Sequence, residues 1–294
     1  MKRVIFTILI CILGTQANAQ DDLMSILEDN ESSGSDFTTA TFKSTRLING
    51  HSIEMRPGGV LEFVISHRFG TLNGGINELY GLDESQIRIA LEYGLSDKIN
   101  VGFGRSSFLK TLDGFVKYKI LRQGTGSGTA PISLVGLGSS TIKTGPTAFT
   151  VPDRAGNKFT HRMAYTFQLL AARKVNSNFS VQLMPTLVHQ NIVSQKVQKN
   201  DILALGIGGR HKLTQRLAFN VEYYHQLTEH IGTENTLAVG LDLETGGHVF
   251  QLHFTNTRAM NNKGFITETT GNWGDGDIHF GFNVSRVFNV RTPK

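Results

Sequence analysis

Gln86-Ile-Arg-Ile-Ala-Leu-Glu-Tyr-Gly-Leu-Ser-Asp-Lys-Ile-Asn-Val-Gly-Phe-Gly104 is the stretch that decides the fold. Its large apolar side chains recur at every second position before and after Ser96-Asp97-Lys98, and the residues between them are polar, glycine or, at position 90, alanine. A period of two gives distinct faces only to a β-strand, and Ser and Asp favour a tight turn. The stretch therefore predicts a β-hairpin with one apolar and one polar face.

The same alternation recurs from Gly59 to Val290 and fits about twelve strands. Short turns are expected near residues 96–98, 176–178, 213–215 and 244–247, and longer loops near 71–84, 144–157, 192–200 and 258–276. Short turns at one end and long loops at the other are typical of outer-membrane barrels. The sequence predicts a single closed antiparallel up-and-down transmembrane β-barrel, with its termini, like its short turns, on the periplasmic side.

A soluble β-sandwich would also show alternating faces. The barrel is favoured because so many Phe and Tyr residues share one face and the opposite face is so polar. In a barrel these faces meet lipid and lumen, and part of an aromatic girdle is expected from Tyr93, Tyr118, Tyr165 and Tyr223. The expected partner of the apolar face is outer-membrane lipid.

The first nineteen residues have the pattern of a secretory signal peptide. Lys2 and Arg3 precede an apolar run, and Ala17-Asn18-Ala19 predicts cleavage between Ala19 and Gln20. Cys11, the only cysteine, lies in this leader, so the mature chain is expected to have no thiol chemistry. The acidic, Ser-rich residues 20–37 are expected to be a flexible lead segment, and 291–294 a short tail.

The charge of the mature chain is mild. Without Lys2 and Arg3, 27 of the 29 basic residues remain against 24 acidic ones, and the basic residues are scattered. This pattern gives no support for nucleic-acid binding. No apolar run long enough for a spanning helix follows the leader, and the body of the chain shows no composition break, which favours one domain.

The sequence shows no recognised catalytic, metal or cofactor motif. The ten histidines lack a helical His-Glu-x-x-His pattern, and the Gly124–Gly128 stretch lacks the Lys-Ser/Thr of a phosphate-binding loop. Some twelve-stranded barrels are phospholipases, which resemble one another through a His near a Ser-Asn pair. Asn176-Ser177-Asn178 has no nearby His, so we expect no enzyme and no cofactor.

The predicted lumen face carries charges of both signs. Its candidate residues are Glu62, Arg68, Arg88, Glu92, Lys117, Lys119, Arg162, Arg210, Glu222, His253 and His279. Mixed charges can line a water-filled pore or bridge across a narrow barrel and fill it. The sequence leaves both alternatives open.

Four stretches carry a resemblance to a known family: 42–46 (Phe-Lys-Ser-Thr-Arg), 49–52 (Asn-Gly-His-Ser), 65–70 (Ile-Ser-His-Arg-Phe-Gly) and 102–107 (Gly-Phe-Gly-Arg-Ser-Ser). Together they resemble the bacterial β-barrel family called domain of unknown function 5777, over essentially the whole mature chain. The resemblance implies an outer-membrane barrel and no particular catalytic or binding residues. Barrels often end on an aromatic residue that the insertion machinery, an expected partner, reads; here six residues follow Phe288.

Three classes of function remain: a passive channel or small-ligand-binding barrel, which is favoured, a structural or adaptor barrel with a filled lumen, and an outer-membrane enzyme such as a lipid hydrolase. The even spread of polar and charged residues favours a wet interior and a small solute as partner. The sequence does not identify that solute or a periplasmic partner.

Residues 38–58 are surplus to an even number of strands that begins at Gly59. Thr38–Arg56 mixes apolar residues with charge, unlike a disordered tail. One hypothesis is a plug that enters the lumen from the periplasm, where Glu62, Glu92 and Glu222 meet Lys43 and Arg46, with His51 as a further plug residue. The alternative is an extra strand at the seam of the barrel.

Overall fold

The computed structural model describes residues 36–126, 128–145, 158–193 and 199–290. The expected signal peptide (1–19), the lead segment up to residue 35 and the tail 291–294 lie outside the described residues. Within the described ranges, no helix is both long and apolar enough to cross a membrane.

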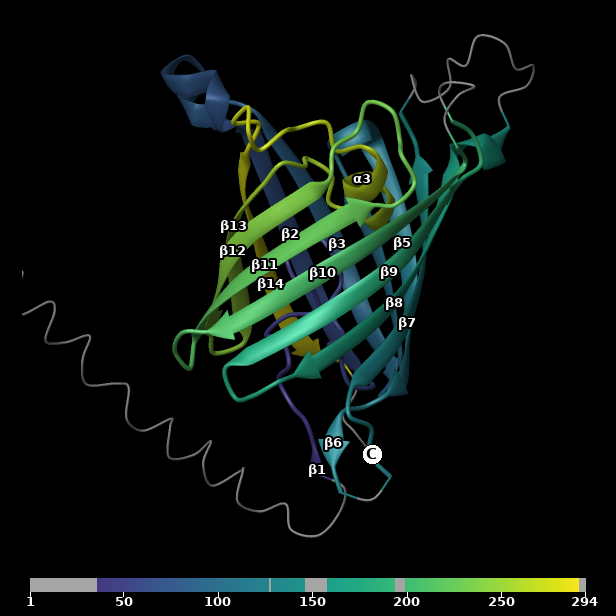
Figure 1. The fold of residues 1–294 in the computed structure, drawn as a ribbon, viewed down its shortest axis with the longest axis vertical. Helices are drawn as coiled ribbons and strands as arrows, with labels where there is room; N and C mark the ends of the chain where they lie inside the picture. Colours follow the sequence, from purple (N-terminus) through teal and green to yellow (C-terminus); the bar gives the residue numbers. More distant parts are fainter. Residues whose placement is uncertain (1–35, 127, 146–157, 194–198, 291–294) are drawn as a thin grey trace, which may run out of the picture.

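Twelve strands form one closed barrel in which every neighbouring pair is antiparallel (Figure 1). Its strands are β2 (Val60–Thr71), β3 (Ser85–Ser96), β4 (Ile99–Ser106), β5 (Thr111–Leu121), β7 (Ser133–Lys143), β8 (Met163–Lys174), β9 (Phe179–Gln190), β10 (Asp201–Lys212), β11 (Leu217–Gln226), β12 (Thr236–Thr245), β13 (His248–Thr255) and β14 (His279–Asn289). The predicted twelve-stranded barrel is confirmed. A sandwich is excluded because closure leaves no sheet edge.

The barrel closes where β14 pairs directly with β2, with Val284 opposite Ile65 and Ser285 opposite Val64. No strand from residues 38–56 lies between them, so the wall is complete without that segment. The expected extra strand at the seam is therefore absent from this part of the described chain.

The two faces of the strands follow the alternation of the sequence. In β3, Ile87, Ile89 and Leu91 are exposed on the outside, whereas Arg88 and Glu92 are buried inside. An apolar outer band with a polar interior is the arrangement of a barrel whose outer surface meets lipid. All four tyrosines of the expected girdle share the outward face of their strands.

We call the end that carries both barrel termini the turn end and the opposite end the loop end. The β3–β4, β8–β9, β10–β11 and β12–β13 turns are short, as predicted. The β5–β7 connection at the same end is longer because it contains β6 (Gly124–Thr125), which pairs with β1 (Asp36–Phe37) outside the barrel. At the loop end the β4–β5 connection is short and holds only the 3-10 turn η2 (Phe108–Lys110). The predicted pattern of short connections at one end and long connections at the other therefore holds except at these two connections.

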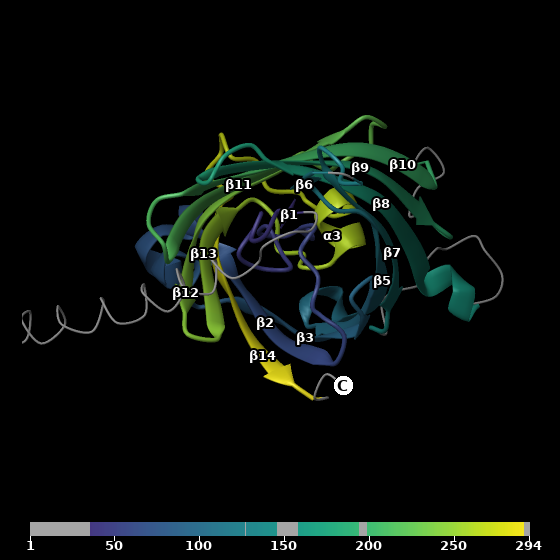
Figure 2. The same ribbon diagram turned by 90° about the horizontal axis from the view of Figure 1, so that it is seen from below.

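The lumen is occupied by two pieces of the chain (Figure 2). One is the lumen segment, residues 38–56, which leads from β1 into the barrel. The other is the inserted loop, residues 256–278, which joins β13 to β14 and carries α3 (Asn262–Thr267). Both contribute to one apolar core with inward wall residues: Leu47 and Phe265 lie in it together with Met184, Val188 and Tyr224.

Candidate functional site: the filled lumen

The lumen segment forms a small hairpin inside the barrel. The Leu47 amide donates to the Gly50 carbonyl and the Ser52 amide to the Thr45 carbonyl, each at 2.9 Å. Every residue from 41 to 53 is buried except Lys43, which is half-buried. A polar backbone this deeply buried must find partners in the surrounding wall.

Glu222, on the inward face of β11, binds the tip of the hairpin. Its carboxylate accepts the backbone amides of Ile48 at 3.1 Å, Asn49 at 3.2 Å and Gly50 at 3.0 Å. Three consecutive backbone donors on one carboxylate form a strong, charge-assisted anchor. The tip of the lumen segment is therefore fixed to the middle of the β11 wall.

Two glycines make this approach close enough. A Cβ on Gly50 would lie 2.3 Å from the Tyr224 hydroxyl, and a Cβ on Gly208 would lie 2.5 Å from a methyl of Leu47. Neither contact is sterically allowed without displacement of the backbone or of a buried side chain. Close packing therefore requires a glycine in the hairpin, Gly50, and a glycine in the wall, Gly208.

Three ion pairs link the lumen segment to the wall, but not all with the expected partners. Arg46 pairs with Glu92 at 3.4 Å, and Arg56 pairs with Glu62 at 2.7 Å. Lys43 pairs with Glu244 at the end of β12 and not with Glu62, Glu92 or Glu222. The predicted meeting of Glu222 with Arg46 or Lys43 is wrong, because backbone amides occupy that carboxylate.

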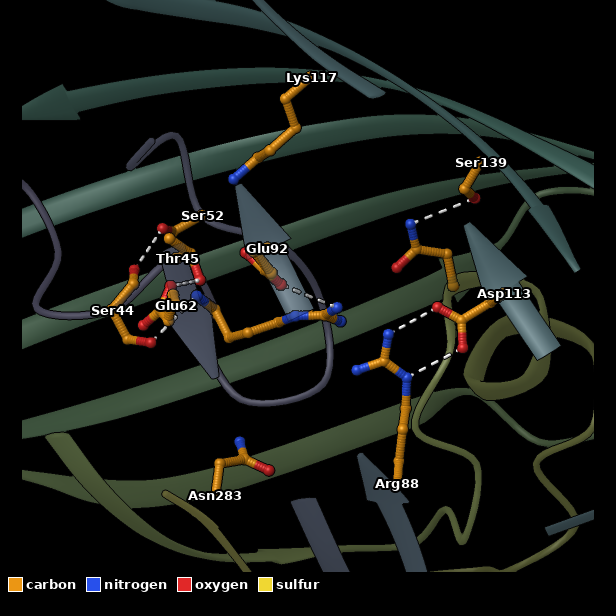
Figure 3. Close-up of polar contacts among 12 residues, drawn as sticks. Ser44, Thr45, Ser52, Glu62, Arg88, Glu92, Asp113, Lys117, Ser139 and Asn283 are labelled. Atoms are coloured by element: carbon orange, nitrogen blue, oxygen red, sulfur yellow. Dashed lines mark hydrogen bonds and ion pairs between the residues drawn. The ribbon is translucent and has the colours of Figure 1, made fainter. Parts of the chain in front are cut away.

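Three further inward cations have partners, and Figure 3 shows the pair of Arg88 and Asp113. Arg88 binds Asp113 across the wall through two bonds, of 2.9 and 2.6 Å. Lys117 donates to the carbonyl of Glu54 at 2.7 Å, and Arg210 donates to the carbonyl of Ala40 at 2.9 Å. Lys117 and Arg210 therefore hold the lumen segment, whereas Arg88 links two strands of the wall.

Arg68 connects the segment to β14. It donates to the side-chain oxygen of Asn49 at 2.9 Å and to that of Asn283 at 3.3 Å. His253 is buried near it, and a ring nitrogen of His253 lies 2.7 Å from where a Cβ of Gly281 would be. A larger residue at position 281 would therefore displace Arg68 or His253.

The other two predicted histidines are packed without a metal-like grouping. His51 lies edge-on to Phe115 with 4.4 Å between ring centroids, and a ring nitrogen of His279 lies 2.9 Å from the Phe69 carbonyl. Within the described ranges, His, Cys, Asp and Glu do not gather in threes around a common point.

Two predicted lumen residues require a correction. Arg162 belongs to the 3-10 turn η3 (Phe159–Arg162) and precedes β8, so it is not in the wall. Arg162 lies an even number of positions before the inward residues of β8, which is why it was assigned to the lumen, but the strand begins one residue later, at Met163. Lys119 is on the inward parity of β5 but is only half-buried near the turn end.

The inserted loop was not predicted as part of the lumen. Glu268, the residue directly after α3, bridges two lysines: Lys143 of β7 at 2.5 Å and Lys263 of α3. Burial alone would raise the pKa of Glu268, but Lys263 and Lys143 outweigh it and lower that pKa to about 2. Burial lowers the pKa of Lys263 to about 8. We call these three residues the loop latch.

The loop latch gives a pH prediction. A depressed carboxylate pKa means that the contribution of Glu268 to stability is complete above about pH 4.5 and is lost as the pH falls toward 2. Limited digestion with pepsin should therefore leave residues 256–278 intact at pH 4 and cleave them near pH 2. Glu268→Gln should be cleaved at both pH values. Equal cleavage of the unaltered chain at pH 4 and pH 2 would contradict this assignment.

With this geometry established, comparison with known proteins identifies the family. Residues 42–288 match the model of the family described as membrane bound beta barrel domain, DUF5777. The chain belongs to this family. The DUF5777 match begins at Phe42 and therefore includes most of the lumen segment as well as the wall. The comparison with curated proteins finds no match.

Solved structures similar to this DUF5777 chain are outer-membrane proteins. The NanC porin is 8% identical with a TM-score of 0.48, over 79% of this chain and 100% of that chain. The KdgM porin is 9% identical with a TM-score of 0.46, over 78% and 99%. The COG4313 outer membrane channel from Pseudomonas putida F1 is 16% identical with a TM-score of 0.42, over 80% and 97%.

Proposed function

We propose that this DUF5777 protein is an outer-membrane channel that its own lumen segment holds closed at rest. The observation that carries the proposal is a set of three buried wall charges, Glu92, Lys117 and Glu222, each of which is hydrogen-bonded to the lumen segment. Water could replace the segment at such groups, because ionised side chains are costly to bury but well hydrated. A purely apolar lumen wall would offer no such groups for water to hydrate after the segment had left.

The position of the segment in the chain supports a closure that can be reversed. The lumen segment precedes β2 and leads outside the barrel to β1 at the turn end. Its withdrawal toward the turn end breaks no strand pairing of the wall, since β14 already pairs with β2. In this proposal a cleaved signal peptide directs the chain to the outer membrane, the insertion machinery folds it there, and the turn end faces the periplasm.

The second candidate is a structural or adaptor barrel that stays filled. The inserted loop favours it, because Phe265 and Ile266 pack into the same core as Leu47 from the other end. In this alternative the lumen segment is a permanent part of the core and the lead residues serve as a tether. No observation on the described residues favours the enzyme alternative.

Planar-bilayer recording of the intact chain tests the closed state. We expect no steady ionic current at low voltage, because residues 41–53 and the inserted loop occupy the lumen. A strand-only barrel of this size with an empty lumen would conduct. A steady open current from the intact, folded chain would contradict the proposal. Heat-dependent migration in detergent gels provides the control that each preparation is folded.

A further inference from the structure

The wall makes more hydrogen bonds to the backbone of the lumen segment than to its side chains, although Phe42, Leu47 and Ile53 also pack in the apolar core. Carbonyls that accept from wall side chains belong to Thr39, Ala40, Thr41, Arg46, Leu47, Ile48, His51 and Glu54. Amides that donate to the wall belong to Ile48, Asn49, Gly50 and Ile53. Backbone groups are common to every peptide, so contacts of this kind depend little on sequence.

Side-chain amides of the wall imitate the edge of a β-strand. Gln182 of β9 accepts the Ile53 amide at 2.9 Å and donates to the His51 carbonyl at 2.8 Å. Both bonds are made by one residue to alternate positions of the segment, as a neighbouring strand would make them. Gln251 of β13 donates to the Leu47 carbonyl at 2.8 Å, and Asn283 of β14 donates to the Ile48 carbonyl at 3.0 Å.

Charged wall side chains also bind the backbone of the segment, with the anion at its amides and the cations at its carbonyls. The Glu222 carboxylate accepts from backbone amides of the segment, whereas the cationic Lys117 and Arg210 donate to its backbone carbonyls. These residues come from β5, β10 and β11, so the wall surrounds a peptide chain with matched donors and acceptors on several sides. The two backbone bonds within the hairpin, from Leu47 to Gly50 and from Ser52 to Thr45, use amides and carbonyls other than those that bind the wall.

We propose that the lumen is a polypeptide-binding site and that the lumen segment occupies it as an internal peptide. The ligand class is an extended or hairpin peptide presented from the turn end, recognised chiefly through its main chain. The inference rests on the proposed function, because a foreign peptide can enter only if the lumen segment leaves. Polysaccharides and small ions lack the alternating amide donors and carbonyl acceptors that these side chains match.

The test uses the full chain with a substitution in the lumen segment that weakens its packing against the wall. Gly50→Val forces the segment away from Tyr224 and leaves every wall residue intact. The probe is a fluorescent synthetic peptide of residues 38–56, and its binding in detergent is measured by anisotropy. A second peptide has alanine at Lys43, whose wall partner Glu244 is 44% exposed, and a third has N-methyl groups on the amides of Ile48 and Gly50.

We expect the first two peptides to bind within about threefold of each other and the N-methylated peptide to bind at least about tenfold more weakly. Gln182→Leu in the same background should weaken all three peptides. Equal binding of the N-methylated peptide, or equal competition by maltoheptaose, would overturn the inference. So would absence of peptide binding when protease cleavage shows that the segment has left the lumen.

The outcomes separate this inference from the channel proposal. Peptide binding by a Gly50→Val chain that never conducts would retain the binding site and reject the channel. Conduction by that chain without peptide binding would retain the channel and reject the polypeptide site.

Discussion

Deletion of residues 38–56 is expected to convert a silent barrel into a conducting one. The deletion removes the buried hairpin and leaves Glu62, Glu92, Lys117 and Glu222 without their partners in the segment, so water enters among them. The wall should still close, because β2 pairs with β14 independently of the segment. The measurement is single-channel current in a planar bilayer.

The matched control deletes residues 20–35 and keeps the lumen segment, and it should remain silent. The truncated chain should conduct less than an empty barrel, because the inserted loop still covers the loop end. Addition of Glu268→Gln to the truncation should raise the current further, since it releases the loop latch. A truncated chain that fails to fold, in detergent and in vesicles, would show that the segment is a structural core element.

Glu222→Ala is expected to free the hairpin tip. It leaves the amides of Ile48, Asn49 and Gly50 without their acceptor in a buried site. If two of these bonds are lost at about 1.5 kcal/mol each, opening of the tip becomes about a hundredfold more frequent. Hydrogen exchange of residues 48–50 should accelerate accordingly, with little change in the wall strands.

Glu244→Gln is the matched control. It removes a carboxylate that also pairs with the lumen segment, through Lys43, but whose side chain is 44% exposed. Exposed pairs contribute about 0–1 kcal/mol, so exchange at the tip should change little. Equal effects of Glu222→Ala and Glu244→Gln would contradict the role of Glu222 as the anchor of the segment.

The sequence predicts the wall well because each strand carries its own evidence. In β3 and β11 the alternation alone assigns Ile87 and Phe219 to the outside and Arg88 and Glu222 to the inside. A strand one residue out of register would place every one of these side chains on the wrong face. The same rule fails at Arg162, because parity continues past the point where the backbone leaves the strand.

The contents of the lumen are harder to predict because they depend on side chain to backbone bonds. An anion among cations predicts an ion pair, yet Glu222 binds three amides, which no residue type in the segment signals. Gln182, Gln251 and Asn283 look like ordinary polar lumen residues until the segment is seen beside them.

The inserted loop was missed because long connections usually lie on the surface. Its buried apolar residues, Ala259, Met260, Phe265 and Ile266, were the available signal within an otherwise polar stretch. Asn261, whose side chain accepts the Gly264 amide at 2.8 Å, caps α3 and shows that this part of the connection has a defined structure.

The most direct test of a closed but releasable lumen uses one cross-linked chain. Lys43→Cys and Glu244→Cys introduce two thiols at an existing contact between the segment and the wall. A short cleavable bis-maleimide then joins them in the folded protein. Urea is raised in the planar-bilayer chamber, because a hydrogen-bonded insert opens before a closed barrel does.

We expect no current in urea while the cross-link is intact. Once the cross-link is cleaved, we expect a reversible current that is lost again when urea is removed. The same current before and after cleavage, or no current in either state up to the urea concentration that unfolds the barrel, would contradict the claim that the lumen segment is a releasable closure.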